Sequence, residues 1–551
     1  MALLIFLALL VSAVAAWRTW RRARFFLHVS QLEGYKTNEY SGWLDGHLRS
    51  HVIAPEHVAG LGALILLALS AHQYAFWGGL FALLVWLIAF ASSARYDGAR
   101  QKKPLVFTDR MRRLATATLI LGAIPVVMGT TAGADGTARG ILPLLAGWLA
   151  ADLGAPLWVY LGLLITKPIE RSYQEGFKRR AKKRLAQRDD LKTIAITGSF
   201  GKTSVKFIVA EILKQRYNAL ATPSSYNTPM GLCIVVNERL RSHHRVLVLE
   251  MGARYRGDIR ELTDLAPPDI AIVTAVGPAH LETMGPIESI AEEKASIIDG
   301  VTEGGQIILN ADDPRVAAMA ERVPPHASRV WRVSASGAAE ADIRATNIHY
   351  DATGVLFTVY DDTGDSADVR AQLLGEHNVL NVLLGVAAGR AMGLQLRQIA
   401  RAIERIEPVE HRLQLKKEGG LTIIDDAFNS NPVGAAAAVE VLGQMPVPQG
   451  GRRVIVTPGM IELGPEQESA NQQFGRQIAE NLKGEGDLAI LVGRRQTEPI
   501  QAGLRDAGFP EARTRVVRSL FEARDIIKLE CQDGDIILYE NDLPDHYNEA
   551  A

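Results

Sequence analysis

A short glycine-containing segment carries the clearest chemical signal in the sequence. It follows an apolar run that ends at Thr197, and it consists of Gly198, Ser199, Phe200, Gly201, Lys202, Thr203 and Ser204. The glycines permit a tight loop whose backbone N–H groups turn inward, and the start of a helix adds its dipole, so the segment can bind phosphate. Lys202 would reach the β- and γ-phosphates of a nucleotide, and the hydroxyl of Thr203 or Ser204 would ligate Mg²⁺. The segment therefore predicts an ATP site.

The segment is shorter than the complete phosphate-loop pattern G-x-x-x-x-G-K-[ST], because Ile196 stands where the first glycine belongs. The alternative interpretation is a glycine turn with a solvated lysine. A strand-like run before the loop and helical spacing of apolar residues after it favour the phosphate loop.

Other polar residues follow apolar runs on the same expected edge of a sheet. Glu250 closes the run 246–250 and is well placed to hold Mg²⁺, although a capping or surface role is the ordinary alternative. His280 follows the run 270–275, where a lone histidine is more often structural than ligating. Lys294 lies in an amphipathic helical segment and on its own is an ordinary solvated lysine.

Two asparagines, Asn378 and Asn381, stand three residues apart at the start of an alanine-rich helical segment. Residues at this spacing share one face of a helix. Their side-chain amides suit the donor and acceptor edge of adenine.

The apolar runs predict an α/β fold. Short β-rich runs alternate with helical segments, which is typical of a mostly parallel sheet covered by helices. A central domain, residues 191–410, is expected to have strands at 193–197, 246–250, 270–275 and 306–310 and a small antiparallel insertion at 343–374. A smaller Rossmann-like domain, residues 411–551, is expected to have strands at 421–425, 453–457, 487–492 and 535–539 and a helix at 466–482.

Composition narrows the class of protein. The 551 residues are too many for one hydrophobic core and predict three or four domains. The net charge of −1 argues against a nucleic-acid partner. Cys233 and Cys531 lie far apart without a C-x-x-C partner, so we expect neither a disulfide framework nor a cysteine zinc site, and a reducing compartment fits.

Nearly all long apolar runs precede Lys167. Five have about the length needed to cross a bilayer, at 2–17, 53–72, 75–95, 114–132 and 140–166. With the N-terminus outside, five spans place every basic loop on one side of the membrane, as the positive-inside rule requires. Residues 1–190 are thus predicted to form a multi-pass anchor in the inner membrane. The anchor would end in a basic amphipathic helix at 168–190, with the rest of the chain in the cytoplasm.

The alternatives for these runs are simpler. A signal peptide is a minority interpretation of the first run, because its arginines follow the apolar core instead of preceding it. A buried soluble helix is the ordinary interpretation of any single run. Asp152, inside the last run, is expensive in lipid and would face neighbouring helices or mark a kink between two shorter segments.

The order of the motifs resembles the ATP-dependent Mur ligase family, and within it the enzymes that add D-alanyl-D-alanine to a muramoyl tripeptide. Motifs in unbroken order are more specific than any one of them. The resembling segments, over about residues 191–470, are Thr197-Gly-Ser-Phe-Gly-Lys-Thr203, Asn227-Thr-Pro-Met-Gly231, Glu250-Met-Gly252, Gly277-Pro-Ala-His-Leu-Glu282, Asn310-Ala-Asp-Asp-Pro314, Gly375-Glu-His-Asn378, Asp425-Asp-Ala-Phe-Asn-Ser-Asn-Pro432 and Gly459-Met-Ile-Glu-Leu-Gly464.

The resemblance implies how ATP would be held. Lys202 and Arg412 would contact its phosphates. Asn378 and Asn381 would contact its adenine, and Asp426 its ribose. Because Arg412 and Asp426 belong to the second domain, the site would close when the two domains meet.

The resemblance also implies metal and substrate positions. Thr203 and Glu250 would hold one Mg²⁺. A second Mg²⁺ would be held by His280 and by Lys294, the latter as a carbamate made from CO₂. The expected substrate contacts are Asn227, Thr228, Asn429 and Asn431.

Three departures accompany the resemblance. The apolar segment stands in place of the family's soluble N-terminal domain, which recognises the UDP end of the substrate. Phe428 occupies a position where the dipeptide-adding enzymes usually have Tyr. After the last strand, Glu540-Asn-Asp-Leu-Pro544 replaces a basic Lys-Gly-Ser-Arg type of ending that helps to bind the incoming amine.

We therefore expect a membrane-anchored, ATP-dependent amide ligase of peptidoglycan precursor synthesis. It would join the carboxylate of a small-molecule or lipid-linked muramoyl peptide to an amino acid or dipeptide. The alternatives are a ligase of the poly-γ-glutamate or folylpolyglutamate type and an ATP-binding membrane scaffold.

Overall fold

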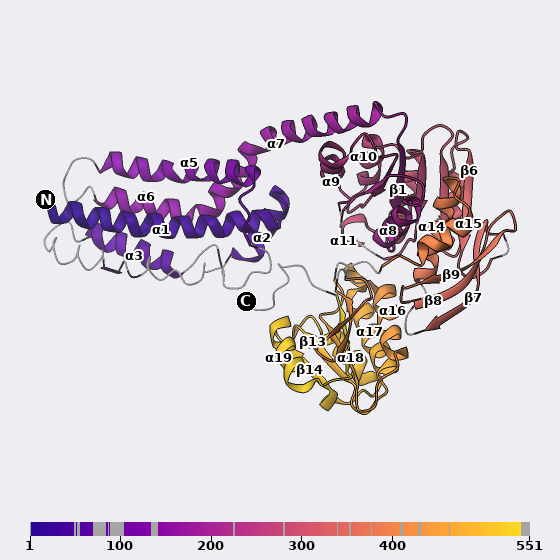
Figure 1. Ribbon diagram of the computed structural model, residues 1–551. Coiled ribbons are helices and arrows are strands. Elements are labelled where there is room, and N and C mark those ends of the chain that lie inside the picture. Colours follow the sequence, from indigo (N-terminus) through magenta and orange to yellow (C-terminus); the bar gives the residue numbers. More distant parts are fainter. Residues whose placement is uncertain are drawn as a thin grey trace. The chain divides into compact units, whose positions relative to one another are not determined.

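The computed structural model divides the chain into two compact units, Met1–Glu175 and Gly176–Ala551 (Figure 1). Helix α7 (Ala155–Ala186) runs from the first unit into the second. The three-domain division at residues 190 and 410 stays a prediction. The residues that the structure describes are 2–48, 51, 55–69, 84–85, 88, 104–133, 141–223, 226–278, 281–338, 340–351, 354–375, 377–407, 411–427, 431–461 and 463–541.

The first unit is helical. Helices lie at four of the five long apolar runs, and the run 75–95 falls almost wholly outside the described residues. The last run is not one straight helix, because α6 and α7 meet at an angle of 64°. The helices before α7 are α1 (Ala2–Leu32), α2 (Thr37–Gly46), α3 (Pro55–Leu69), α5 (Asp109–Ala132) and α6 (Ile141–Leu153).

Over the described part of the chain, one helix, Asp109–Ala132, is by itself long and apolar enough to cross a membrane. The bent pair Leu142–Leu153 and Ala155–Ala186 is a second candidate if it counts as one span, and Pro55–Leu66 is a shorter apolar helix. The five-span arrangement therefore stays a prediction.

A buried ionic cluster joins three helices of the first unit. The carboxylate of Asp152, in α6, accepts a hydrogen bond from Arg18 Nε of α1 at 3.1 Å and lies 2.8 Å from His57 Nε2 of α3. All three side chains are 4 % exposed or less. Both expectations for Asp152 are met, since it faces neighbouring helices and lies beside the break between α6 and α7.

The second unit contains a nine-stranded sheet in the order β2-β3-β1-β4-β5-β6-β7-β8-β9. It is parallel from β2 to β7, and the hairpins β7–β8 and β8–β9 are antiparallel. Its strands are β1 (Lys192–Thr197), β2 (Ala219–Ala221), β3 (Val246–Glu250), β4 (Ile270–Val273), β5 (Gln306–Asn310), β6 (Arg329–Ser334), β7 (Ile343–Asp351), β8 (Gly354–Tyr360) and β9 (Ser366–Ala371).

The four strands expected for this domain are confirmed, and so is the antiparallel insertion. The short edge strand β2 and strand β6 were not expected. Because β6 pairs with β7, the insertion extends the central sheet instead of forming a sheet of its own.

Alternate side chains of the sheet pack on different layers of helices, as the two-residue period of a strand requires. Ile194 and Ile196 belong to the core with α8 and α14, whereas Ala195 belongs to the core with α9, α10 and α12. The helices of this domain are α8 (Lys202–Leu213), α9 (Pro229–Ile234), α10 (Asp258–Leu265), α11 (Leu281–Met284), α12 (Ile287–Asp299), α13 (Pro314–Ala317), α14 (His377–Ala391) and α15 (Leu396–Ile403).

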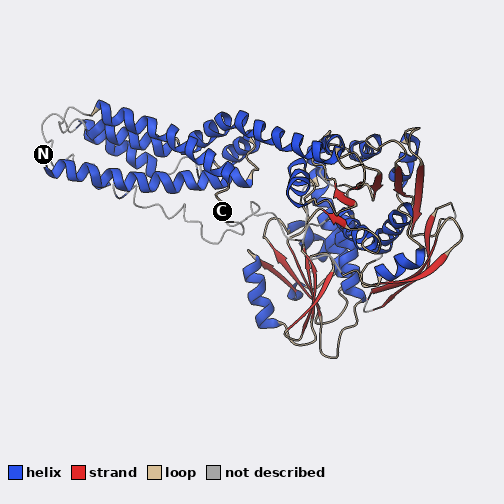
Figure 2. Ribbon diagram, turned by 45° about the horizontal axis from the view of Figure 1, so that its top comes forward, coloured by secondary structure: helices blue, strands red, loops and turns tan. Residues whose placement is uncertain are grey.

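A second sheet follows, in the order β10-β11-β15-β12-β13-β14, and Figure 2 shows helices on both of its faces. It is parallel except for the edge strand β10. The four expected strands and the expected helix are confirmed, whereas β10 and β14 were not expected. The elements are β10 (Gln414–Glu418), β11 (Leu421–Asp426), α16 (Pro432–Gln444), β12 (Arg453–Thr457), α17 (Gln467–Asn481), β13 (Leu488–Val492), α18 (Glu498–Asp506), β14 (Thr514–Val517), α19 (Leu520–Glu530) and β15 (Ile536–Glu540).

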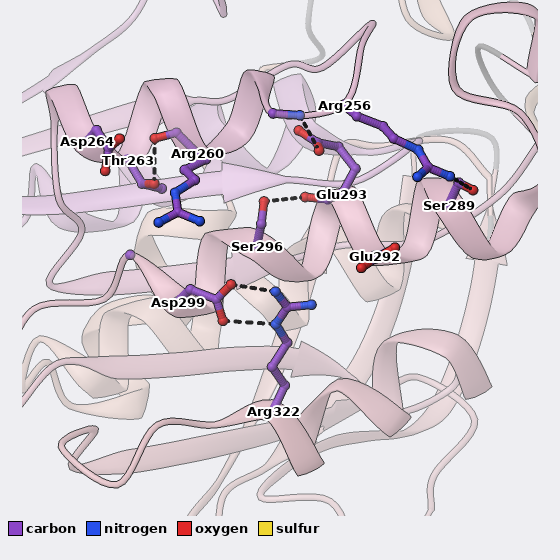
Figure 3. Close-up of a pocket in the computed structure, with 12 residues that line it drawn as sticks. Arg256, Arg260, Thr263, Asp264, Ser289, Glu292, Glu293, Ser296, Asp299 and Arg322 are labelled. Atoms are coloured by element: carbon purple, nitrogen blue, oxygen red, sulfur yellow. Dashed lines mark hydrogen bonds and ion pairs between the residues drawn. The ribbon is translucent and has the colours of Figure 1, made fainter.

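Glu293, in α12, fixes the start of α10 (Figure 3). Its two carboxylate oxygens accept hydrogen bonds from the backbone N–H groups of Gly257 at 2.7 Å and Ile259 at 2.8 Å. Figure 3 draws the contact with Gly257. The first N–H groups of a helix have no partner within the helix, so an acidic side chain there satisfies them and matches the helix dipole. This contact holds α12, the helix that carries Lys294, against the segment that follows β3.

Replacing Glu293 by alanine should loosen the first turn of α10. The two lost hydrogen bonds to a charged group amount to about 2 kcal/mol, which corresponds to roughly 30-fold faster amide hydrogen exchange at Gly257 and Ile259. Glu292→Ala is the matched control, because Glu292 is the exposed neighbour in the same helix and its loss should be nearly neutral. Equal exchange rates in the two variants would contradict the contact's role.

Candidate functional site

The glycine loop lies where the order of strands reverses. Strand β1 pairs with β3 on one side and with β4 on the other, and the loop leaves its carboxyl end. In open α/β sheets, ligands bind in the crevice beyond such a point. The loop therefore lies at the carboxyl ends of the parallel strands, where sequence analysis expected a ligand to bind.

Both glycines of the loop have backbone conformations that other residues rarely adopt, with φ of +147° at Gly198 and +77° at Gly201. A Cβ atom on Gly198 would lie 2.0 Å from Thr274 Oγ1, and one on Gly201 would lie 2.5 Å from Asn381 Oδ1. Ser199 Oγ donates to the Gly277 carbonyl at 3.1 Å. The loop therefore has no room for side chains at its two glycines.

The Lys202 ammonium group folds over its own loop. It donates to the carbonyl oxygens of Gly198 at 2.6 Å and Ser199 at 3.2 Å. Burial lowers the pKa of Lys202 to about 8; the carboxylate of Glu250 opposes this shift, and the charge of Arg412 adds to it. A bound polyanion would replace these weak carbonyl partners.

Glu250 is the centre of a buried hydrogen-bond network at the end of β3. Its Oε2 accepts from Thr203 Oγ1 at 2.9 Å and from Lys206 Nζ at 3.0 Å, and its Oε1 accepts from Asn227 Nδ2 at 3.2 Å. Burial by itself would raise the pKa of the Glu250 carboxyl. The charges of Lys206 and Lys202 and the hydrogen bonds hold that pKa below its usual value. Sequence analysis missed Lys206, although it stands one helical turn after Thr203.

The Thr203 hydroxyl and the Glu250 carboxylate suit one Mg²⁺. Both are hard oxygen donors, and Mg²⁺ usually takes one or two protein oxygens and completes its shell with phosphates and water. Among the described residues, no three His, Cys, Asp or Glu side chains form a metal-binding group. His280 lies outside the described residues, so the second metal position stays a prediction.

Lys294 is buried in α12, with 2 % of its surface exposed. Burial lowers the pKa of its ammonium group to about 7, and the positive charge of Lys202 lowers it further, while Glu293 and Asp258 oppose the shift. In a large fraction of the molecules, the Lys294 side chain is thus a neutral amine near pH 7. This is the form that reacts with CO₂, so the site fits the expected carbamate.

The two asparagines share one face of α14, as their spacing predicted. Asn381 Nδ2 donates to Asn378 Oδ1 at 2.9 Å, and Asn378 Nδ2 donates to the Leu374 carbonyl at 2.7 Å. Asn381 also lies against Gly201 of the loop. Their packing depends on Gly385, where a Cβ atom would lie 2.5 Å from Ile208 Cγ2 of α8.

Arg412, from the segment that precedes the second sheet, lies beside the glycine loop. Arg412 Nη2 lies 3.4 Å from Thr203 Oγ1. Asp426 accepts a hydrogen bond from the Leu413 N–H at 3.1 Å, and burial raises the pKa of its carboxyl to about 6. The structure therefore brings Arg412 to the loop, as expected.

A cavity of about 800 Å³ lies beside the start of α14, where His377 lines it. Its volume falls in the range of small-molecule sites. The segment before α14 forms one wall and α16 another, and the lining includes Leu374, Gly375, His377, Pro432, Val433 and Ala436.

The residues expected to contact the substrate make hydrogen bonds within the protein in this structure. Thr228 caps α9 by accepting from the Gly231 N–H at 3.3 Å, and Asn431 caps α16 by accepting from the Gly434 N–H at 2.9 Å. Asn227 contacts Glu250 as described above. Asn429 and Phe428 lie outside the described residues. Ser204 lies in the first turn of α8.

The residues at the unusual ending of the last strand also make hydrogen bonds within the protein. Glu540 is buried and accepts a hydrogen bond from Thr457 Oγ1 at 2.5 Å. Asn541 donates to the Gly459 carbonyl at 2.6 Å. Residues 542–544 of this ending lie outside the described residues.

Comparisons with known proteins agree with this geometry. Residues 196–389 match the Mur ligase middle domain, and residues 411–539 match the Mur ligase, glutamate ligase domain. The chain is 35 % identical over 305 residues to the UDP-N-acetylmuramoyl-tripeptide–D-alanyl-D-alanine ligase of Escherichia coli, which covers 55 % of this chain and 65 % of that one. It is 32 % identical over 368 residues to the ligase of the same name from Mycobacterium leprae, covering 63 % and 70 %.

The match to some relatives is shorter, and for the ligase of Mycobacterium bovis it is 38 % identical over 52 % of this chain and 56 % of that one. Among solved structures, MurF of Acinetobacter baumannii superposes with a TM-score of 0.58 at 26 % identity, covering 67 % of this chain and 77 % of that one. MurF of Thermotoga maritima in complex with ADP superposes with a TM-score of 0.57 at 23 % identity, covering 67 % and 80 %, which shows the shared fold.

Replacing Gly201 by alanine should weaken nucleotide binding while the chain stays folded. The added Cβ atom would push Asn381 away from the loop, and we expect the affinity for Mg²⁺-ADP to fall at least about tenfold, or 1.4 kcal/mol. Gly257→Ala is the matched control, because Gly257 also precedes a helix with positive φ but has open space around it. Binding would be measured by calorimetry, and equal affinities in the two variants would contradict the site.

Proposed function

Because the chain belongs to the Mur ligase family, we propose that it is an ATP-dependent ligase that joins a carboxylate to an amine through an acyl phosphate. The observation that carries this proposal is the group of Lys202, Thr203, Glu250 and Arg412 around the glycine loop. The ADP complex of the Thermotoga maritima enzyme, which has the same fold, supports a nucleotide as the ligand.

The chain's own residues would serve the first step by neutralising charge. A substrate carboxylate attacks the γ-phosphorus of ATP, the bond to the β-γ bridging oxygen breaks, and an acyl phosphate and ADP result. Lys202 and Arg412 would bind the transferred group, whose oxygens gain charge in the transition state. Asn378, Asn381 and Asp426 would hold the nucleoside end.

In the second step the substrate amine attacks the acyl carbon, gives up a proton, and phosphate leaves with both electrons of the broken C–O bond. Water would hydrolyse the acyl phosphate, so the meeting of the two halves of the site protects it. Thr203 and Glu250 would hold a Mg²⁺ that neutralises phosphate charge. Lys294 as a carbamate and His280 would hold the second Mg²⁺, which would neutralise further phosphate charge.

The acceptor and the amine belong to the same proposal. The named relatives act on a muramoyl tripeptide and D-alanyl-D-alanine, and we propose a peptidoglycan precursor of this kind as acceptor. Residues 1–190 lie outside both matched domains, and we propose below that their helices lie in the inner membrane. A membrane location would bring the ligase domains close to lipids. We therefore propose that the acceptor is lipid-linked and reaches the site at the cytoplasmic face of the membrane.

Phosphate release by the detergent-solubilised full chain tests this function. We expect one phosphate per amide, and only when ATP, a carboxylate acceptor and an amine are all present. Lys202→Met should lower the rate roughly 100-fold, because it removes a cation from the transferred phosphoryl group.

The acceptor is offered in soluble UDP-linked and in lipid-linked form, each with D-alanyl-D-alanine or single amino acids. Preference for the soluble form would reject the lipid-linked proposal. Glutamate as the preferred amine would point to a poly-γ-glutamate or folylpolyglutamate type of ligase. Release of phosphate without acceptor or amine would reject the ligase.

We also propose that the first unit lies in the inner membrane, with the ligase domains in the cytoplasm. Large apolar side chains on two of its helices are 48–73 % exposed, and surfaces of this kind mark contact with lipid or a partner. They are Val58, Leu61, Ile65, Leu66 and Leu69 of α3, and Leu119, Ile120, Ile124, Val127 and Met128 of α5.

Replacing Ile120 by lysine distinguishes a lipid environment of α5 from an aqueous one. In water an exposed substitution is nearly neutral, whereas a lysine in the middle of a lipid-facing helix costs about 3 kcal/mol. We expect much less of this variant in membranes washed with alkaline carbonate. Leu529→Lys, on α19 and 84 % exposed, is the control and should behave like the unchanged chain. Extraction of the unchanged chain by carbonate would reject the anchor.

A further inference from the structure

Lys206 is a buried cation that the proposed reaction does not use. Its side chain has 0 % exposed surface, in a helix whose neighbouring positions Val205 and Ile208 belong to the core. Burying an ammonium group is unfavourable unless it is paired. An apolar residue would fill this position in the helix without that penalty, so the charge itself needs an explanation.

The partner of Lys206 is the carboxylate that would hold the metal. Lys206 Nζ lies 3.0 Å from Glu250 Oε2, with side chains 0 % and 2 % exposed. Thr203 stands three residues earlier on the same face of α8 and donates to the same oxygen at 2.9 Å. Two groups of one helix therefore hold Glu250 from the same side.

The other oxygen of Glu250 is held as well. Asn227 Nδ2 donates to Oε1 at 3.2 Å. The carboxylate is thus oriented by three side chains. Lys206 is the only one of the three that carries a charge, and Lys202 adds a further attraction to the same carboxylate. Without Lys206, Glu250 would lose its direct ion-pair partner while it lies beside the place where phosphates would bind.

We infer that Lys206 is a positioning residue that acts as an internal counter-cation for Glu250. It keeps the carboxylate oriented toward Thr203 before the metal arrives, and it screens the nucleotide phosphates from that carboxylate. A bound Mg²⁺ would supply this screening in place of Lys206. The inference rests on the proposed use of Thr203 and Glu250 as metal ligands.

The consequence is that Lys206 matters most for nucleotide bound without metal. In the variant Lys206→Met, the carboxylate of Glu250 has lost its direct ion-pair partner and repels the phosphates of ADP more strongly. In Mg²⁺ the same carboxylate binds the metal without a competing ammonium group. The ratio of the ADP dissociation constants in EDTA and in Mg²⁺ should therefore rise at least about tenfold over that of the unchanged chain.

The experiment is calorimetric titration of the full chain with ADP, in EDTA and in Mg²⁺. Lys214→Met is the matched control, because Lys214 follows the same helix but is 57 % exposed and pairs with Glu211 at the surface. An unchanged ratio in Lys206→Met would show that Lys206 only fills space, and would overturn the inference. Because no ligation is measured, an inactive but ADP-binding chain would refute the proposed function and leave this inference standing.

A second variant covers the case in which Lys206→Met does not fold. Removing both members of a buried ion pair is often nearly neutral, whereas removing one leaves an unpaired charge. The double variant Lys206→Met with Glu250→Gln should then fold, and its ADP affinity should be nearly the same in EDTA and in Mg²⁺. Failure of the double variant to fold would show a packing role and overturn the inference.

Discussion

The site depends on how closely the glycine loop approaches its surroundings. Gly198 lies against Thr274 of the neighbouring strand end, and Gly201 lies against Asn381 of α14. Asn381 can be there because Gly385, one turn further on, lets α14 pack on Ile208 of α8. The phosphate loop and the expected adenine contacts are therefore one packed assembly. A larger side chain at any of these glycines would therefore displace the other parts of this assembly.

The charges of the site follow from this packing. Lys202, Lys206, Lys294 and Arg412 lie near the loop, and Glu250 balances part of their charge. Burial in the company of other cations lowers the pKa of Lys202 to about 8 and that of Lys294 to about 7. A nucleoside triphosphate at the loop would add negative charge and so improve the electrostatic balance of the site.

The sequence predicted the strands that carry strong apolar runs and missed those that do not. Strands β1, β3, β4 and β5 are mostly apolar runs that contain β-branched residues, whereas β2 has three residues and β10 is the charged edge Gln414–Glu418. Motifs named Lys202, Glu250 and Asn381, and the structure brings these three residues together around the loop. Lys206 was missed because its meaning depends on Glu250, which is 44 residues away in sequence and reaches it only through the pairing of β1 with β3.

The first unit shows why buried polar groups cannot settle whether a helical bundle lies in lipid. Asp152 is paired with Arg18 and His57 at 3.1 and 2.8 Å. This pairing is required in either medium, because an isolated buried carboxylate is as unfavourable inside a soluble bundle as inside a membrane-spanning one. The outer surface distinguishes the two. Side chains such as Ile120 and Leu69, 63 % and 73 % exposed, gain from lipid and lose in water, so they carry the argument for the membrane that the cluster does not.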